Sequence, residues 1–125
     1  MQAAGSAGGD PVYVEDVFST YLYTGNNSVS TQTFNTGLDM AGEGGMIWFK
    51  SRTSSQVARI MDTERGTRAS LIPSSNAANS NLGADGLTYL SNGFSIGWTG
   101  GDLASAQDYV SWSFRKQTGF FDVVT

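Results

Sequence analysis

The densest group of charged side chains surrounds one turn, Asp62-Thr63-Glu64-Arg65-Gly66, with Arg59 before it and Arg68 after it. Carboxylates and guanidinium groups at this spacing could recognise a sugar or a charged partner, because both make charge-assisted hydrogen bonds. The same residues could instead pair with one another across a tight turn in which Gly66 adopts positive φ. We favour the second interpretation, in which the cluster fixes a hairpin.

A calcium site is the next candidate chemistry. Asp85, Asp102 and Asp108, with Asn81 and Asn92, offer the oxygen ligands that Ca²⁺ requires. Their spacing matches no calcium loop, so we interpret them as polar residues of turns.

Glycoside hydrolysis would need two carboxyl groups about 5 to 10 Å apart across a cleft. Glu15-Asp16 and the pair Asp62/Glu64 lie instead within one turn or at adjoining strand positions. The sequence also contains no histidine and no cysteine, which removes the usual general base near neutral pH and the commonest metal ligands. We therefore predict a non-enzymatic domain without catalytic residues, metal or cofactor.

Aromatic side chains could stack on sugar rings. Trp48 and Trp112 lie inside strand patterns, and we assign them to the core. Trp98 follows a predicted strand and is the better candidate for an exposed platform. Together with Tyr89 and Asp102 it forms our candidate glycan contact, next to the polar loops 74–86 and 99–107.

Composition predicts one all-β domain. The 125 residues include 16 Gly, 7 Phe, 5 Tyr and 3 Trp, the mixture of turn formers and β-favouring aromatics that many short strands need. The net charge of −4 disfavours nucleic acid as a partner, since phosphate binding needs a basic surface. No apolar run approaches the ~20 residues that span a bilayer, so we expect no membrane insertion.

The predicted strands are organised around Gly44-Gly45-Met46-Ile47-Trp48-Phe49-Lys50-Ser51-Arg52, where four large apolar side chains in succession indicate a central strand. Turn residues predict a hairpin of strands 17–23 and 29–34, and another that joins the central strand to 56–61. A strand at 67–72, a hairpin of 87–90 with 94–98, and strands at 108–114 and 120–124 complete the set. Alternation in 108–114 places Val110, Trp112 and Phe114 on one face, which we assign to the core with Ile47, Phe49, Ile60, Phe94 and Ile96.

Residues 1–13 read as an extended arm before the β-sandwich domain at 14–125. Residues 1–10 are small and polar, so the arm is either flexible or held by a neighbouring protein. Our candidate partner-binding residues are Gln2, Ser6, Pro11, Val12 and Tyr13. Since Phe120-Phe121-Asp122-Val123-Val124-Thr125 repeats the character of Glu15-Asp16-Val17-Phe18-Ser19-Thr20, we expect the domain to be the first module of a longer chain.

Four motifs, in this order, resemble modules of bacteriophage tail-fibre and related virion structural proteins. They are Glu43-Gly44-Gly45-Met46-Ile47-Trp48-Phe49-Lys50-Ser51-Arg52, then Asp62-Thr63-Glu64-Arg65-Gly66-Thr67, then Leu87-Thr88 with Ser91-Asn92-Gly93-Phe94-Ser95-Ile96-Gly97, then Tyr109-Val110-Ser111-Trp112-Ser113-Phe114-Arg115-Lys116. The resemblance covers residues 15–125 and implies an antiparallel jelly-roll β-sandwich of the concanavalin-A-like or LamG-like kind. It carries no catalytic or metal residues.

The resemblance implies assembly rather than catalysis. The expected function is that of an N-terminal module that anchors a tail fibre or tail protein to the virion, made in the host cytoplasm. Its expected partners are other virion proteins and further copies of itself, as a homotrimer. The alternative is a carbohydrate-binding module that contacts host surface glycans.

Overall fold

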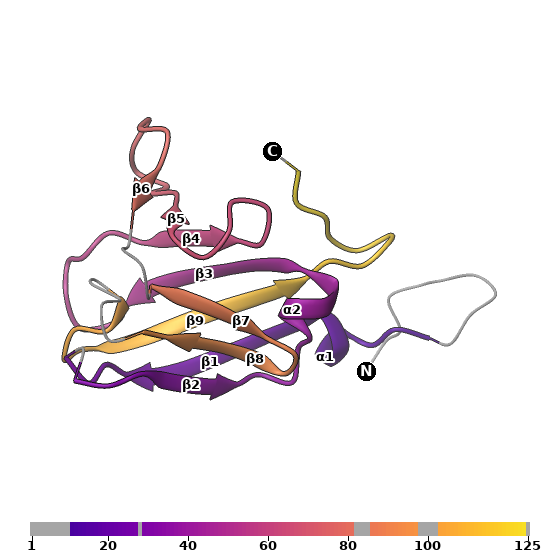
Figure 1. Cartoon of the computed structure of the whole chain (residues 1–125), viewed down its shortest axis with the longest axis horizontal. Coiled ribbons are helices and arrows are strands. Elements are labelled where there is room, and N and C mark those ends of the chain that lie inside the picture. The colour runs from indigo at the N-terminus through magenta and orange to yellow at the C-terminus, as the bar shows by residue number, and fades with distance from the viewer. Residues whose placement is uncertain (1–10, 28, 82–85, 98–102, 125) are drawn as a thin grey trace.

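The computed structural model describes residues 11–27, 29–81, 86–97 and 103–124. Gln2, Ser6, Trp98 and Asp102 lie outside the described residues. The described chain contains two short helices and nine strands (Figure 1): α1 (Val14–Val17), β1 (Phe18–Thr24), β2 (Gln32–Asn35), α2 (Met40–Glu43), β3 (Gly45–Ser51), β4 (Arg59–Asp62), β5 (Ala69–Ser70), β6 (Ser80–Asn81), β7 (Leu87–Leu90), β8 (Gly93–Ile96) and β9 (Asp108–Arg115).

The strands form antiparallel sheets, which confirms the predicted all-β class. One sheet has the order β1-β9-β3-β4, a second has the order β2-β8-β7, and β5 pairs with β6. β3 lies between β9 and β4, so the prediction of a central strand is confirmed. Gly44 opens it with φ +81°, and a Cβ on Gly45 would collide with the backbone oxygen of Phe114 on β9.

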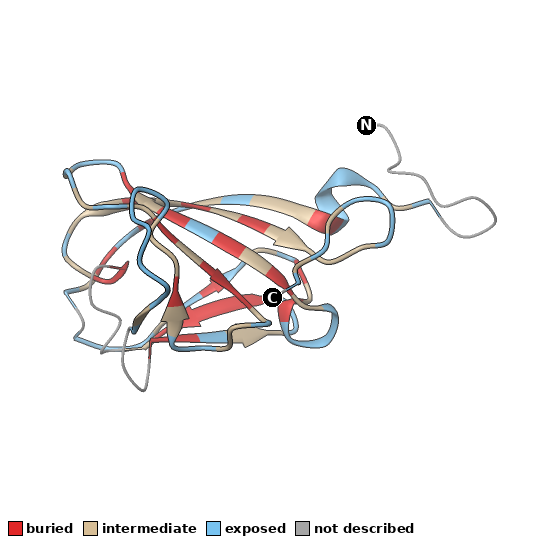
Figure 2. Cartoon of the chain, turned by 90° about the horizontal axis from the view of Figure 1, so that it is seen from above, coloured by how far each residue is buried: buried red, intermediate tan, exposed pale blue. Residues whose placement is uncertain are grey.

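The core lies between the four-stranded and three-stranded sheets. Figure 2 shows the two layers from above, with buried residues concentrated where the layers face each other. The ring centroids of Tyr23 and Phe34 are 4.4 Å apart, and those of Phe49 and Phe94 are 5.5 Å apart, so aromatic rings from both sheets interlock. The predicted burial of Ile47, Phe49, Phe94 and Ile96 is confirmed, whereas Ile60 is half-buried.

The predicted orientation of β9 is wrong. Tyr109, Ser111 and Ser113 face the core and are 1%, 0% and 0% exposed, while Val110, Trp112 and Phe114 are only half-buried on the opposite face. Alternation separates two faces but does not say which one is inside. Inside, large rings from the neighbouring strands fill the space, and the small serines make room for them. Trp48, also assigned to the core, is 38% exposed.

Two predicted pairings are also wrong. β1 and β2 do not form a hairpin, because β1 pairs with β9 in one sheet and β2 pairs with β8 in the other. The glycine and asparagines at 25–27 reverse the chain, but this reversal carries it from one layer to the other. Residues 120–124 form no strand: residues 118–120 are a turn, closed by an isolated bridge between Gln117 and Phe121. The hairpins β3–β4 and β7–β8 are confirmed.

Candidate functional site

The candidate site is the face of the four-stranded sheet that points away from the core, which we call the outer face. Strand registers arrange its side chains in rows. Phe18, Phe114 and Met46 lie in one row, Thr20, Trp112, Trp48 and Ile60 in the next, Leu22, Val110 and Lys50 in the third, and Thr24 and Asp108 in the fourth. Since residues two apart on a strand share a face, these rows form one continuous surface. In Figure 2 this surface is the upper side of the upper layer.

The centre of the outer face is a pair of tryptophans. Trp48 and Trp112 lie directly opposite each other on β3 and β9, with ring centroids 6.0 Å apart and ring planes at 71°. Trp48 is 38% exposed and Leu22 is 56% exposed. Aromatic side chains on an accessible surface are the usual anchors of binding interfaces.

The charged side chains of the outer face have partners within the chain. The carboxylate of Asp108, at the start of β9, accepts a hydrogen bond from the hydroxyl of Thr24 at 2.8 Å. The amino group of Lys50 donates hydrogen bonds to the carbonyls of Ser51 and Gln56, at 3.0 and 2.8 Å. Asp62, whose register position opposes Met46, is 1% exposed and forms an ion pair with Arg65. The charged groups nearest to the apolar rows are therefore satisfied within the chain.

The charged residues around the turn after β4 bind one another and the neighbouring hairpin. This agrees with the interpretation that the cluster has a structural role. The Asp62 carboxylate accepts hydrogen bonds from the backbone N–H of Arg65, at 2.8 Å, and from its guanidinium group. Arg59 is 9% exposed, and its guanidinium donates to the hydroxyls of Ser70 and Ser80, both at 3.0 Å. These contacts tie β4 to the β5–β6 hairpin.

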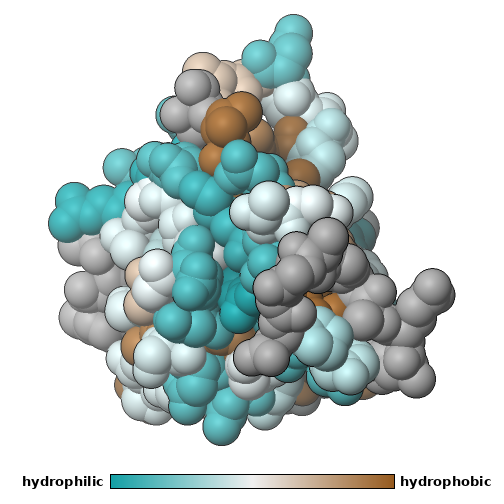
Figure 3. All heavy atoms as spheres, turned by 90° about the vertical axis from the view of Figure 1, so that its right-hand side faces the viewer, coloured by the Kyte–Doolittle hydropathy of each residue, from teal (hydrophilic) through white to brown (hydrophobic). Residues whose placement is uncertain are grey.

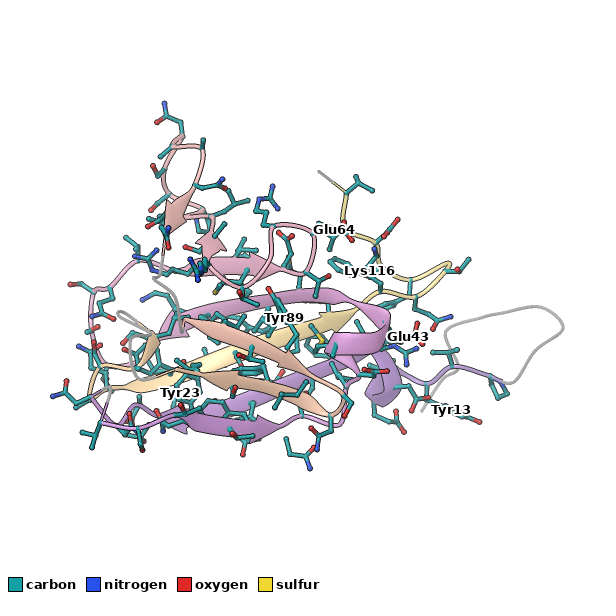
Figure 4. All side chains as sticks on the ribbon, in the orientation of Figure 1. Tyr13, Tyr23, Glu43, Glu64, Tyr89 and Lys116 are labelled. Carbon is teal, nitrogen blue, oxygen red and sulfur yellow. The ribbon has the colours of Figure 1, made fainter. Side chains whose placement is uncertain are left out.

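A shallow cleft of about 600 Å³ lies at the end of the sandwich beside the turn at 117–122. It is lined by Glu43 and residues 116–122, and Figure 3 shows this end of the molecule as mainly hydrophilic. Lys116 bonds to Glu64 at 2.8 Å, and this hydrogen bond raises the pKa of its amino group; Figure 4 shows the two side chains together. Asp122 lies 3.5 Å from the same amino group. The positively charged side chain in the cleft, Lys116, is therefore already paired with carboxylates.

The described part of the chain contains no group of three or more His, Cys, Asp or Glu residues that could hold a metal ion. Within the same residues, no helix is long and apolar enough to cross a membrane.

Of the predicted glycan-contact residues, Tyr89 is within the described chain. It lies on β7, in the three-stranded sheet, and packs against the core. Its hydroxyl donates to the carbonyl of Gly66 at 3.2 Å, and burial raises its pKa. Tyr89 therefore belongs to the opposite layer from Trp48 and Trp112 (Figures 1 and 4).

Three of the predicted partner-binding residues precede α1. Pro11 is exposed, Val12 is half-buried and Tyr13 is 40% exposed. The backbone N–H of Tyr13 donates to the carboxylate of Asp16 at 2.9 Å, which caps the first turn of α1. Figure 4 shows Tyr13 at the end of the sandwich that carries both helices.

Sequence reasoning missed the outer face. The strand patterns assign Trp48 and Trp112 to the core, although the serines at 111 and 113 alternate with the large side chains of β9. A strand that is apolar on one face and small on the other can have its small face inside when the facing sheet supplies large rings. The alternation of serines with large side chains on β9 is therefore the sequence signal that could have indicated the outer face.

The fold and the site define an all-β domain of antiparallel sheets with an apolar, accessible outer face. The chain belongs to a family described as a domain of unknown function (DUF7483), which matches residues 14–121. No curated protein and no solved structure matches the chain.

Proposed function

We propose that this domain is a non-enzymatic structural module of a bacteriophage virion protein, with a jelly-roll sandwich of the concanavalin-A-like or LamG-like kind. The observation that carries the proposal is the outer face: a mainly apolar sheet surface with Trp48 38% and Leu22 56% exposed. Apolar patches of this kind on a domain surface mark contacts with other macromolecules.

The four motifs that resemble phage virion modules support the proposal through their positions. The first forms the end of α2 and all of β3, the second forms the charged turn, the third contributes to β7 and β8, and the fourth is most of β9. These elements build the core, and β3 and β9 carry the central tryptophans of the outer face. The resemblance therefore extends to the surface that we assign to assembly.

The charged groups support a structural role. Asp62 is bound by Arg65, and Lys116 is bound by Glu64. Groups that are held in ion pairs within one chain stabilise its turns, whereas a catalytic acid or base needs a proton that it can exchange with a substrate.

Contact with a host glycan is the second candidate function, and the exposed ring of Trp48 favours it. Sugar rings stack on aromatic faces, but their hydroxyls also require hydrogen-bonding partners. Among the outer-face residues, all of which the structure describes, Thr20 supplies the side-chain hydroxyl nearest to the tryptophans. The hydroxyl of Thr24 donates to Asp108, and the amino group of Lys50 is committed to carbonyls. The outer face is therefore better suited to a protein partner.

The test is the protein composition of purified phage particles. Mass spectrometry should find the chain at a fixed copy number, and Trp48→Ser should reduce that number several-fold. The control, Val29→Ser, changes a residue that is 79% exposed and lies in the loop between β1 and β2, outside the strands of the outer face. Absence of the wild-type chain from particles would refute the virion assignment, and normal incorporation of Trp48→Ser would show that attachment uses another surface.

A further inference from the structure

We propose that the outer face is the contact between two copies of this chain, which pair face to face through their four-stranded sheets. This inference extends the proposed function. It rests on one part of that proposal, namely that the outer face binds a protein.

Charge is the first reason for choosing a second copy as the occupant. The chain carries a net charge of −4, so two copies repel each other over most of their surfaces. A two-fold contact places the same patch on both sides, and any unpaired charge would therefore face its own kind. On the outer face the amino group of Lys50 is turned to the carbonyls of Ser51 and Gln56, and Asp62 is 1% exposed beneath Arg65. Asp108 adds a carboxylate at the end of the face, where it accepts a hydrogen bond from the hydroxyl of Thr24 at 2.8 Å. The rows around the tryptophan pair can therefore meet themselves without like-charge contact.

Shape is the second reason. Sheet faces stack at about 10 Å with their side chains interdigitated, as the two layers of this domain do. The outer face has the same construction, with Trp48 and Trp112 at its centre and Phe18, Phe114 and Leu22 around them. Of the ring contacts recorded on it, Phe18–Phe114 and Trp48–Trp112 lie within the sheet, and Phe114–Phe121 covers one end. The tryptophan pair is left as the anchor for a facing sheet.

Area sets the strength of the pairing. Four strands at ~4.8 Å spacing, with seven residues at ~3.3 Å in β1 and β3, give a face of roughly 400 Å². Contact between two such faces would bury roughly 800 Å² of flat area in total. Because protruding side chains add surface, the buried area rises toward the ~1,200 Å² at which specific interfaces begin. The expected dimer is therefore weak, with a Kd of about 1 to 100 μM.

Sedimentation equilibrium over ~1 μM to 1 mM tests the pairing. The wild-type chain should pass from one to two copies, and its tryptophan emission should move to shorter wavelength as Trp48 becomes covered. Leu22→Lys and Trp48→Lys place a charge at the edge and at the centre of the face, and each should weaken the dimer at least tenfold. Val29→Lys adds the same charge at an exposed position outside the strands of the face and should leave the Kd within about twofold.

The outcomes separate the two proposals. A wild-type chain that stays a single copy at 1 mM, a mass of three copies, or a dimer unaffected by Leu22→Lys would overturn the pairing. Melting temperatures of the lysine variants identify any that fail to fold, and the wild-type emission shift needs no variant. A dimer from a chain that is absent from particles would sink the virion assignment alone. A monomer whose incorporation depends on Trp48 would sink the pairing alone.

Discussion

Removal of one buried hydroxyl, by Ser113→Ala, should stabilise this domain. Ser113 is 0% exposed, and its Oγ is buried with no hydrogen-bond partner among the described residues. Burial of an uncompensated hydroxyl costs about 1 to 3 kcal/mol in protein mutational data. The lower β-propensity of alanine and the small space left by the oxygen offset part of that gain. The expected net change is about +1 kcal/mol in the free energy of unfolding, or about +4 °C in Tm for a domain of this size.

Ser111→Ala is the matched control, since it changes the same residue type on the same face of β9. Its hydroxyl is buried but donates to the carbonyl of Tyr21 at 3.5 Å, so its removal forfeits a weak hydrogen bond. Urea unfolding followed by circular dichroism should place Ser113→Ala above Ser111→Ala by more than about 1 kcal/mol, because the propensity change is common to both and only Ser111→Ala loses a hydrogen bond. Equal stabilities would refute the orientation of β9, since a serine on the solvent face loses little with its hydroxyl.

Three further predictions concern the core, the tyrosines and the arm. Phe49→Ala should cost about 3 to 5 kcal/mol in urea unfolding, because Phe49 is 1% exposed and packs on Phe94; a cost below about 1 kcal/mol would contradict its place between the sheets. Burial raises the pKa of Tyr23 and Tyr89, so the folded state keeps protons that unfolded tyrosines lose near pH 10. Stability should be full below pH 10 and fall above it by about 1.4 kcal/mol per pH unit for each tyrosine, and Tyr89→Phe should reduce that slope; a stability that stays constant to pH 12 would contradict the burial. Deletion of residues 1–10 should leave the Tm nearly unchanged and lower incorporation into particles, and unchanged incorporation would assign attachment to the sandwich itself.

The sequence predicted those parts of the fold that depend on local patterns. The four apolar residues of β3 and the Asn-Gly turn between β7 and β8 identify their strands without reference to the rest of the chain. Sheet assignment was not predictable in the same way. The turn after β1 has hairpin residues, yet β1 pairs with β9, about ninety positions later, because only the complete core decides which edge each strand occupies.

The candidate site was the least predictable part. Trp112 and Ser113 are neighbours on β9, and the usual rule sends tryptophan inside and serine outside. Here Phe49 and Phe94 fill the space between the sheets, so the small residue fits inside and the indole lies on the outer face. The orientation of β9 depends on the volume of the aromatic rings on other strands. The pattern of one strand alone therefore cannot predict it. The candidate glycan residues Trp98 and Asp102 lie outside the described residues, and their assignment stays a prediction.

The most direct test of the account is hydroxyl-radical footprinting of Trp48 in the dilute chain and in the assembled particle. Trp48 is 38% exposed and its neighbour Phe49 is 1% exposed, so the two residues report the two faces of one strand in the same peptide. We predict that Trp48 is oxidised in the dilute chain and protected in the particle, while Phe49 is protected in both. Protection of Trp48 in the dilute chain at micromolar concentration or below would place it in a core, and oxidation in both states would show that the outer face contacts nothing.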